Sequence, residues 1–300
     1  MTAAPAAVRA APAWVWQLAA GIALAVALLL VFADRLWPAM ARQAAAQQLH
    51  LERLDQPAGG RPQVVALGDS KLRFAVLHDR AFSTPDHGAA LDVDFVRISR
   101  DGARTADMAP ALERLCRQPP ALLLLQADFL IWRRGSAAAT GFDPLLHWRE
   151  NVRRLRAWWG HRQRPAGAEN LGLPADWQQH GSSLGALPRD YLRRRYQRSV
   201  RHWRPPLAED LQVWESTLDC LRRQGTAIVV LPIPRAPFAQ ALLPEALAAH
   251  ERERLAQLAA DPDRLVWATP LAFADDDFHD EGHMAEAAQR RYSDWLREAL

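Results

Sequence analysis

Residues 63–75 read QVVALGDSKLRFA, and this stretch indicates the fold. Its first half is a short apolar run rich in valine and leucine, which is typical of a buried parallel strand. Gly68 and Asp69 then form a turn, and Ser70 begins a helical pattern. Because Gly68 has no side chain, it permits a tight turn from strand to helix. A strand that passes directly into a helix is the first half of a β-α-β unit.

Outward from this stretch, apolar runs alternate with helical patterns along the chain. The runs lie at 63–67, 93–99, 121–130, 226–232 and 264–269, and the helical patterns lie near 71–80, 104–117, 207–224, 241–260 and 284–299. Five strands, each followed by a helix, predict a parallel sheet covered on both faces, with right-handed connections. The fold class we expect is therefore α/β, a three-layer sandwich.

A long segment at 133–205 interrupts this alternation, and we interpret it as a helical insertion near the carboxyl ends of the strands. Helices are expected at 144–159 and 189–202. The segment carries 15 arginines against five acidic residues, a local excess of +10, with five interleaved tryptophans. Such a surface suits an anionic glycan or lipid headgroups. The alternative is a solvated helical face in an arginine-rich chain, since 36 of the 37 basic residues are arginine and only Lys71 is lysine.

The N-terminal region contains 21 residues without a charge, at 13–33. As a helix they would span about 31 Å, close to the hydrocarbon thickness of a bilayer. We expect a cytoplasmic tail at 1–12, an uncleaved membrane anchor at 13–33 and a stalk with linker at 34–61, followed by the α/β domain at 62–300. A cleaved signal peptide is the alternative, although its apolar region is normally shorter. Charges flanking the span do not decide its orientation.

The composition excludes several classes of protein. Hydrophobic residues make up 49% and charged residues 24%, so the chain is neither disordered nor collagen-like. A mean hydropathy of −0.22 excludes a polytopic membrane protein. Two cysteines are too few for zinc fingers or ferredoxin-type clusters. The net charge of +3 is too small to indicate nucleic acid, and we expect none as a partner.

Two motifs from opposite ends of the domain carry candidate chemistry. Ser70 lies at a helix start, where a serine by itself is typical of an N-cap. Near the C-terminus, Asp280 precedes His283 by three residues, just before the last helix. At that spacing the carboxylate can accept from Nδ1 of the imidazole, which leaves Nε2 free to take a proton. The alternative is that Asp280 caps the final helix. The first and last loops of a parallel sheet meet at its carboxyl edge, so we predict a Ser70–His283–Asp280 triad.

These motifs resemble those of the SGNH/GDSL hydrolase superfamily over roughly residues 62–300. The resemblance implies a five-stranded sheet of flavodoxin-like order, with Ser70 as nucleophile. Gly102, after the second strand, resembles the glycine whose N–H joins that of Ser70 in the oxyanion hole. Asp69 and Arg73, which flank Ser70, are further candidates for binding the oxyanion or the substrate.

One motif departs from this family. Its third strand usually ends in Gly-x-Asn-Asp, whose Asn completes the oxyanion hole, whereas here Gln126 and Asp128 occupy the region. Loss of one oxyanion donor typically costs about 100- to 1000-fold in rate. A degenerate third motif combined with a membrane anchor is similar to the cell-envelope branch, which includes accessory proteins of alginate O-acetylation and of D-alanyl-lipoteichoic acid synthesis. This resemblance implies an inner-membrane location with the domain in the periplasm.

Two smaller features leave alternatives open. The tract from Asp275 to His283 offers carboxylates and imidazoles for a divalent metal, but Gly282 and the lack of a further ligand cluster disfavour this, so we expect no metal and no cofactor. Cys116 and Cys220 each lie near the end of a helix, and these two helices should be neighbours on one face of the sheet. An oxidising compartment would permit a bridge, although two unpaired thiols are the simpler expectation.

The resulting hypothesis is an acyl ester hydrolase or O-acyltransferase, with acetyl as the favoured group on the strength of the resemblance alone. Its expected substrate is an envelope or exported polysaccharide. The alternative hypothesis is a non-catalytic scaffold that partners a polytopic membrane-bound O-acyltransferase. Hydrolysis and transfer share one acyl-enzyme intermediate, so the residues do not separate them.

Overall fold

The structure is a computed structural model that describes residues 13–36, 51–55, 60–83, 91–100, 103–134 and 189–300. The chain divides into two compact units, one formed by residues 1–44 and 141–164 and the other by residues 45–140 and 165–300. The described part of the first unit is helix α1 (Ala13–Leu36), which contains the stretch predicted as a membrane anchor. Within the described ranges, no helix combines the length and apolar character needed to cross a membrane.

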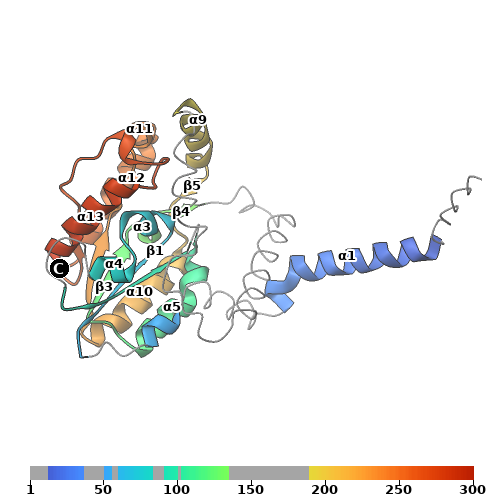
Figure 1. Cartoon of the computed structure of the whole chain (residues 1–300), viewed down its shortest axis with the longest axis horizontal. Coiled ribbons are helices and arrows are strands. Elements are labelled where there is room, and N and C mark those ends of the chain that lie inside the picture. The colour runs from blue at the N-terminus through green and yellow to red at the C-terminus, as the bar shows by residue number, and fades with distance from the viewer. Residues whose placement is uncertain (1–12, 37–50, 56–59, 84–90, 101–102, 135–188) are drawn as a thin grey trace, which may run out of the picture. The chain divides into compact units, whose positions relative to one another are not determined.

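The second unit contains the parallel sheet that the alternating pattern predicts (Figure 1). The strand order is β2-β1-β3-β6-β7, and every neighbouring pair is parallel. In chain order of these strands this is 2-1-3-4-5, the flavodoxin-like order, as expected. The bounds are β1 (Gln63–Gly68), β2 (Asp94–Ser99), β3 (Leu122–Gln126), β6 (Ala227–Leu231) and β7 (Leu265–Val266).

Helices cover both faces of this sheet. The connection after β1 runs to one side and the later connections run to the other, so right-handed crossovers place their helices on opposite faces. The contacts agree, because α3 packs with α13 and α5 packs with α10. The helices are α3 (Ser70–Ala75), α4 (Asp79–Ser83), α5 (Thr105–Arg117), α6 (Asp128–Ile131), α10 (Ala208–Arg223), α11 (Pro237–Ala241), α12 (Glu245–Ala259) and α13 (Glu286–Ala299), with short 3₁₀ turns η1 (Leu51–Asp55) and η2 (Asp275–Asp277).

Four elements differ clearly from their predicted extents. The strand expected at 264–269 is shortened to β7, Leu265–Val266. The strand expected at 121–130 ends at Gln126, and the apolar residues that follow wind into α6 instead. A short apolar run does not distinguish a buried strand from a buried helix, which explains the error. The helix expected at 71–80 is split into α3 and α4. The helix expected at 241–260 begins only at Glu245, as α12, because Pro244 cannot donate a backbone hydrogen bond. The short helix α11 before it was not expected.

The two ends of the long segment between β3 and α10 lie next to each other. They form a small antiparallel ladder between β4 (Arg133–Arg134) and β5 (Trp203–Arg204). Before β5 comes α9 (Arg189–Val200), where a helix was expected at 189–202. Tyr196 of α9 packs edge-on against Trp203, whose ring also contacts Trp132. The helix predicted at 144–159 lies outside the described residues.

The two cysteines are joined in a disulfide, so the expectation of two unpaired thiols is wrong. Cys116 of α5 and Cys220 of α10 have their Cα atoms 6.0 Å apart. The helices are neighbours on one face, as the topology predicted. Each cysteine lies near the C-terminal end of its helix, and that places both at the same end of the helix pair.

Candidate active site

Ser70 is placed by the turn that joins β1 to α3. Asp69 is the N-cap of α3, and its side chain accepts a hydrogen bond of 2.8 Å from the backbone N–H of Lys71. Ser70 is therefore the first helical residue and not the cap. A Cβ atom at Gly68 would lie 2.3 Å from Cβ of Leu72, so only glycine lets the helix follow the strand this closely.

Gln126 supports this turn from the neighbouring strand. Its side chain is fully buried, and its Oε1 accepts a hydrogen bond of 2.8 Å from the backbone N–H of Asp69. Its Nε2 donates to Asp128 over 3.2 Å. Since both ends of the amide are engaged behind the turn, Gln126 fixes the backbone next to Ser70. Because both polar atoms of its amide are already engaged, the geometry disfavours the oxyanion-binding role that the sequence suggested for Gln126.

Asp280 and His283 lie on a tight loop before the last helix. A bridge between Phe278 and Met284 closes the loop, and both side chains are buried. Oδ1 of Asp280 accepts from the backbone N–H groups of Gly282 and His283, each over 3.0 Å. The residue at the cap of α13 is Ala285. Asp280 therefore does not cap the final helix, which was the structural alternative for this motif.

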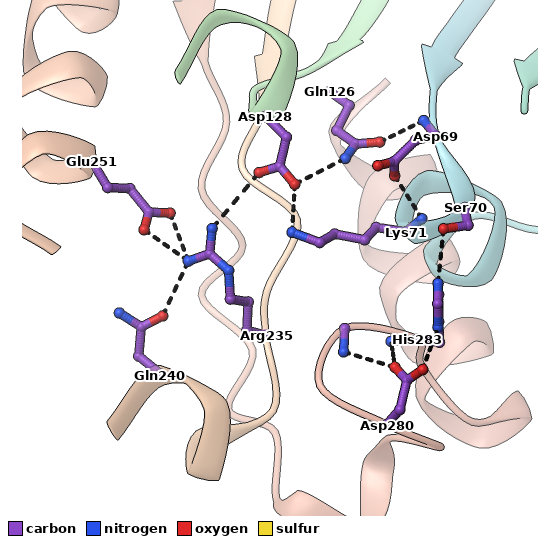
Figure 2. Close-up of polar contacts among 11 residues, drawn as sticks. Asp69, Ser70, Lys71, Gln126, Asp128, Arg235, Gln240, Glu251, Asp280 and His283 are labelled. Carbon is purple, nitrogen blue, oxygen red and sulfur yellow. Dashed lines mark hydrogen bonds and ion pairs between the residues drawn. The ribbon is translucent and has the colours of Figure 1, made fainter. Parts of the chain in front are cut away.

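The structure brings Ser70, His283 and Asp280 together in one hydrogen-bonded series (Figure 2). Nε2 of His283 lies 2.8 Å from Oγ of Ser70, and Nδ1 lies 2.8 Å from Oδ2 of Asp280. The Asp280 side chain is 2% exposed and that of His283 is 22% exposed. A buried carboxylate thus orients an imidazole that is partly exposed to solvent and contacts the serine hydroxyl. This is the geometry in which an imidazole removes a proton from an attacking hydroxyl.

Asp280 is held in its charged form. Burial alone would raise the pKa of its carboxyl, but the hydrogen bond and charge of His283 lower it. The N–H of Gly282 and the guanidinium of Arg195 lower it further. The net result is a pKa of Asp280 far below its ordinary value, so the residue is an acceptor over the whole neutral range. Burial also lowers the pKa of the nearby His279, more than Asp280 raises it.

A second polar network begins at the residue after Ser70. Nζ of Lys71 forms an ion pair with Asp128, and both Asp128 and Glu251 pair with Arg235 (Figure 2). Nζ of Lys71 also lies 5.4 Å from the ring centroid of Trp203. The Lys71 and Arg235 side chains are only 4% and 3% exposed. Two buried cations thus face two carboxylates, which balances the charge.

The remaining predicted residues lie as follows. Gly102 lies outside the described residues. Asp69 acts as a helix cap, and Asp128 is occupied by its ion pairs. The guanidinium of Arg73 lies 5.2 Å from the ring of Phe74, which in turn lies 4.7 Å from the imidazole of His283. Arg73 is therefore at the edge of the site and not on the reacting atoms.

Sequence reasoning did not assign three residues that the structure places at the site. Lys71 could have been predicted to lie at the site, because it is the only lysine of the chain and directly follows the candidate nucleophile. Arg195 was one of many arginines in the long segment, and Arg235 lay in an apolar, proline-rich stretch. Neither of these had a spacing that pointed to the site. In the part of the chain that the structure describes, no group of three or more metal-ligating side chains could hold a metal ion.

Comparisons with known proteins add little to this geometry. No family model matches the chain, and no curated protein matches it. A "putative acylhydrolase" of Bacteroides fragilis is similar in structure at 11% identity and a TM-score of 0.42, covering 84% of this chain and 92% of its own. A GDSL-like lipase of Bacteroides thetaiotaomicron is similar at 11% identity and a TM-score of 0.40, covering 85% of this chain and 97% of its own. No functional conclusion is drawn from structural similarities at these identities and TM-scores. The functional assignment therefore depends on the contacts within the site.

Proposed function

We propose that the protein is a serine acyl ester hydrolase or O-acyltransferase of the SGNH/GDSL type. The observation that carries the proposal is the hydrogen-bonded series from Ser70 through His283 to the buried Asp280. Each heavy-atom distance in it is 2.8 Å, within the range for proton transfer between a nucleophile and its base.

The proposed reaction begins with attack of Ser70 Oγ on the carbonyl carbon of an ester. Nε2 of His283 takes the hydroxyl proton, and Asp280 stabilises the imidazolium that forms. The bond from the carbonyl carbon to the alcohol oxygen then breaks, and the alcohol leaves with the proton from His283. Water or a sugar hydroxyl next attacks the acyl-serine with His283 again as base, which releases the acyl group and restores Ser70.

The finer parts of the proposal come from the sequence and from its resemblance to the cell-envelope branch of the family. We propose that the acyl group is acetyl and that the substrate is an envelope or exported polysaccharide. We also propose that residues 13–33 attach the chain to the inner membrane, with the domain in the periplasm. The Cys116–Cys220 disulfide supports an oxidising compartment, because such bonds are rare in the cytoplasm. Fractionation of cells, with and without residues 1–61, tests the attachment.

A second candidate function is favoured by one observation. Asp128 lies in the region where the family places its oxyanion-binding Asn, and its carboxylate is engaged by Lys71 and Arg235. A carboxylate does not stabilise a developing oxyanion. A non-catalytic scaffold beside a membrane-bound O-acyltransferase would not need this donor.

A fluorophosphonate probe separates the two candidates. The enzyme predicts covalent labelling of the wild-type chain and no labelling of Ser70→Ala. The scaffold predicts that neither protein is labelled. Labelling that persists in Ser70→Ala would contradict the proposed nucleophile, because the phosphonyl group would then be on another residue.

A further inference from the structure

Helix α9 of the long segment reaches the triad through one side chain. Nη2 of Arg195 lies 3.0 Å from Oδ2 of Asp280, the same oxygen that accepts from Nδ1 of His283. The same nitrogen lies 3.0 Å from Oε2 of Glu281. Two donors, one cationic and one from the imidazole, therefore share a single carboxylate oxygen.

Packing of α9 holds Arg195 in this position. Leu192, Tyr196 and Val200 recur at helical spacing and are buried. Tyr196, the next residue after Arg195, packs edge-on against the Trp203 ring at 6.0 Å. At the start of the helix, Arg189 pairs with Asp276 over 2.6 Å. The buried face of α9 thus belongs to the same hydrophobic core as Phe278 and Met284 of the triad loop, while the Arg189–Asp276 pair lies at the surface.

The charge of Arg195 acts on the same oxygen that supports the imidazole. A cation at Oδ2 draws part of the carboxylate charge away from His283, which weakens the stabilisation of the imidazolium. Arg195 is 34% exposed, so solvent moderates the effect. Burial opposes the charge of Arg195, but Glu281 and Asp280 outweigh it, and the pKa of Arg195 lies above its ordinary value.

We propose that Arg195 is a positioning residue of the triad, which fixes Asp280 and limits how strongly this carboxylate stabilises protonated His283. The proposal rests on the proposed function for its effect on rate. Its effect on the imidazole is independent of that function. It gives the long segment a role at the reacting groups, beyond a charged surface.

The groups that face His283 define what else acts on it. From its own loop come Asp280, Glu281 and His279, and from α9 comes Arg195. From α3 come the Ser70 hydroxyl, the Phe74 ring with Arg73 over it, and the Lys71 stem, which packs against Gly282. Among these described groups, Arg195 is the arginine in direct contact with the Asp280 carboxylate. Its removal should therefore have the most direct effect on the titration of His283.

An NMR titration of the His283 imidazole in the full-length chain tests the proposal. The His283 signal is identified by its loss in His283→Ala. In Arg195→Ala we expect the titration midpoint to rise by about 0.5 pH unit. Arg194→Ala is the matched control, because Arg194 is exposed on the same helix and should leave the midpoint unchanged. Arg195→Lys keeps the charge and should retain most of the wild-type midpoint.

Activity provides the second measurement. In Arg195→Ala the acid limb of kcat/KM should move to higher pH by the same amount. We also expect kcat to fall about 10-fold, because Asp280 is then no longer fixed in position to orient His283. If thermal unfolding shows that Arg195→Ala does not fold, Arg195→Gln keeps the length of the side chain without its charge and is measured instead.

The outcomes separate this proposal from the proposed function. A midpoint that rises in Arg195→Ala but not in Arg194→Ala or Arg195→Lys supports it, whether or not the wild-type chain hydrolyses esters. An unchanged midpoint in a folded Arg195→Ala or Arg195→Gln overturns it, even if ester hydrolysis is demonstrated. Equal shifts in Arg194→Ala and Arg195→Ala also overturn it, since the effect would then be one of net charge.

Discussion

Two polar networks leave the turn that contains Ser70, and they differ in where they end. One runs from Ser70 through His283 to Asp280 and reaches solvent at the imidazole and at Arg195. The other runs from Lys71 through Asp128 to Arg235 and Glu251 and includes two almost fully buried cations. In Figure 2 the first network runs downward from the turn and the second extends to the left.

The difference indicates a division of tasks between adjacent residues. The first network has a hydroxyl in contact with a basic nitrogen of a partly exposed imidazole, an arrangement that general base catalysis requires. The second has opposite charges that satisfy one another, and such a buried network chiefly fixes one conformation. We therefore infer that the first network sets the rate of reaction and the second sets the stability of the turn.

The largest effect should come from removing the hydroxyl of the first network. Ser70→Ala should lower ester hydrolysis at least about 1000-fold, because no acyl-enzyme can form. Its free energy of unfolding should change by only about 1 kcal/mol, the net contribution of the one hydrogen bond between Ser70 and His283. Acetyl release and urea unfolding measure the two quantities. An unchanged rate in Ser70→Ala would rule out the covalent mechanism.

A smaller loss of rate should follow Asp280→Asn, with a pH-dependent loss of stability. The amide cannot hold the imidazole in the same way, so we expect at least about a 100-fold lower rate. The pKa of Asp280 is lowered by folding, so its stabilisation is complete above about pH 4 and is lost as the pH falls below that. The difference in unfolding free energy between wild type and Asp280→Asn should therefore be larger at pH 7 than at pH 3. An equal difference at both pH values would contradict this assignment.

Disruption of the second network should lower the free energy of unfolding. Lys71→Met leaves Asp128 with one fewer cation, and we expect a loss of about 3 kcal/mol in unfolding free energy. The double variant Lys71→Met with Asp128→Leu should lose less than the sum of the single variants, because neither charge is then left unpaired. Urea unfolding of all four proteins gives the coupling energy. Strict additivity would show that the ion pair does not stabilise the turn.

The smallest effect in this series should come from the residue before the turn, on which both networks depend. Gly68→Ala would place a methyl group 2.3 Å from Cβ of Leu72 and 2.7 Å from Oε1 of Gln126. We expect a loss of about 2 kcal/mol, together with reduced activity, because the turn must shift. Gly21→Ala is the control, since no described atom lies within 4 Å of the added carbon. Thermal unfolding and acetyl release compare the two variants.

The sequence allowed most of the first network to be predicted and little of the second. Ser70 was found because glycine, aspartate and serine end an apolar run, and His283 because a carboxylate precedes it by three residues. Each of these is a local pattern, and the parallel topology then brings the two loops to one edge. The pairing of α5 with α10 followed from the same topology, whereas the strand order came from the family resemblance.

The second network has no local pattern, which explains why it was missed. Lys71, Asp128, Arg235 and Glu251 come from four separate elements or loops, and their pairing depends on side-chain directions in the folded chain. The contact of Arg195 with Asp280 spans 85 positions in the sequence. The exact ends of β3 and α12 also depended on burial and on Pro244, and not on periodicity alone.

The bond between Cys116 and Cys220 joins two positions 104 apart in the sequence and so closes the chain into a ring with two tails. A protease that cuts once inside that ring therefore opens the loop without releasing a fragment. On a gel run without reductant the cut protein would migrate as a single species, and it would separate into two bands only after the thiols are regenerated. The strands on either side of the cut, β1 to β3 and β6 to β7, would thus remain covalently connected after such damage.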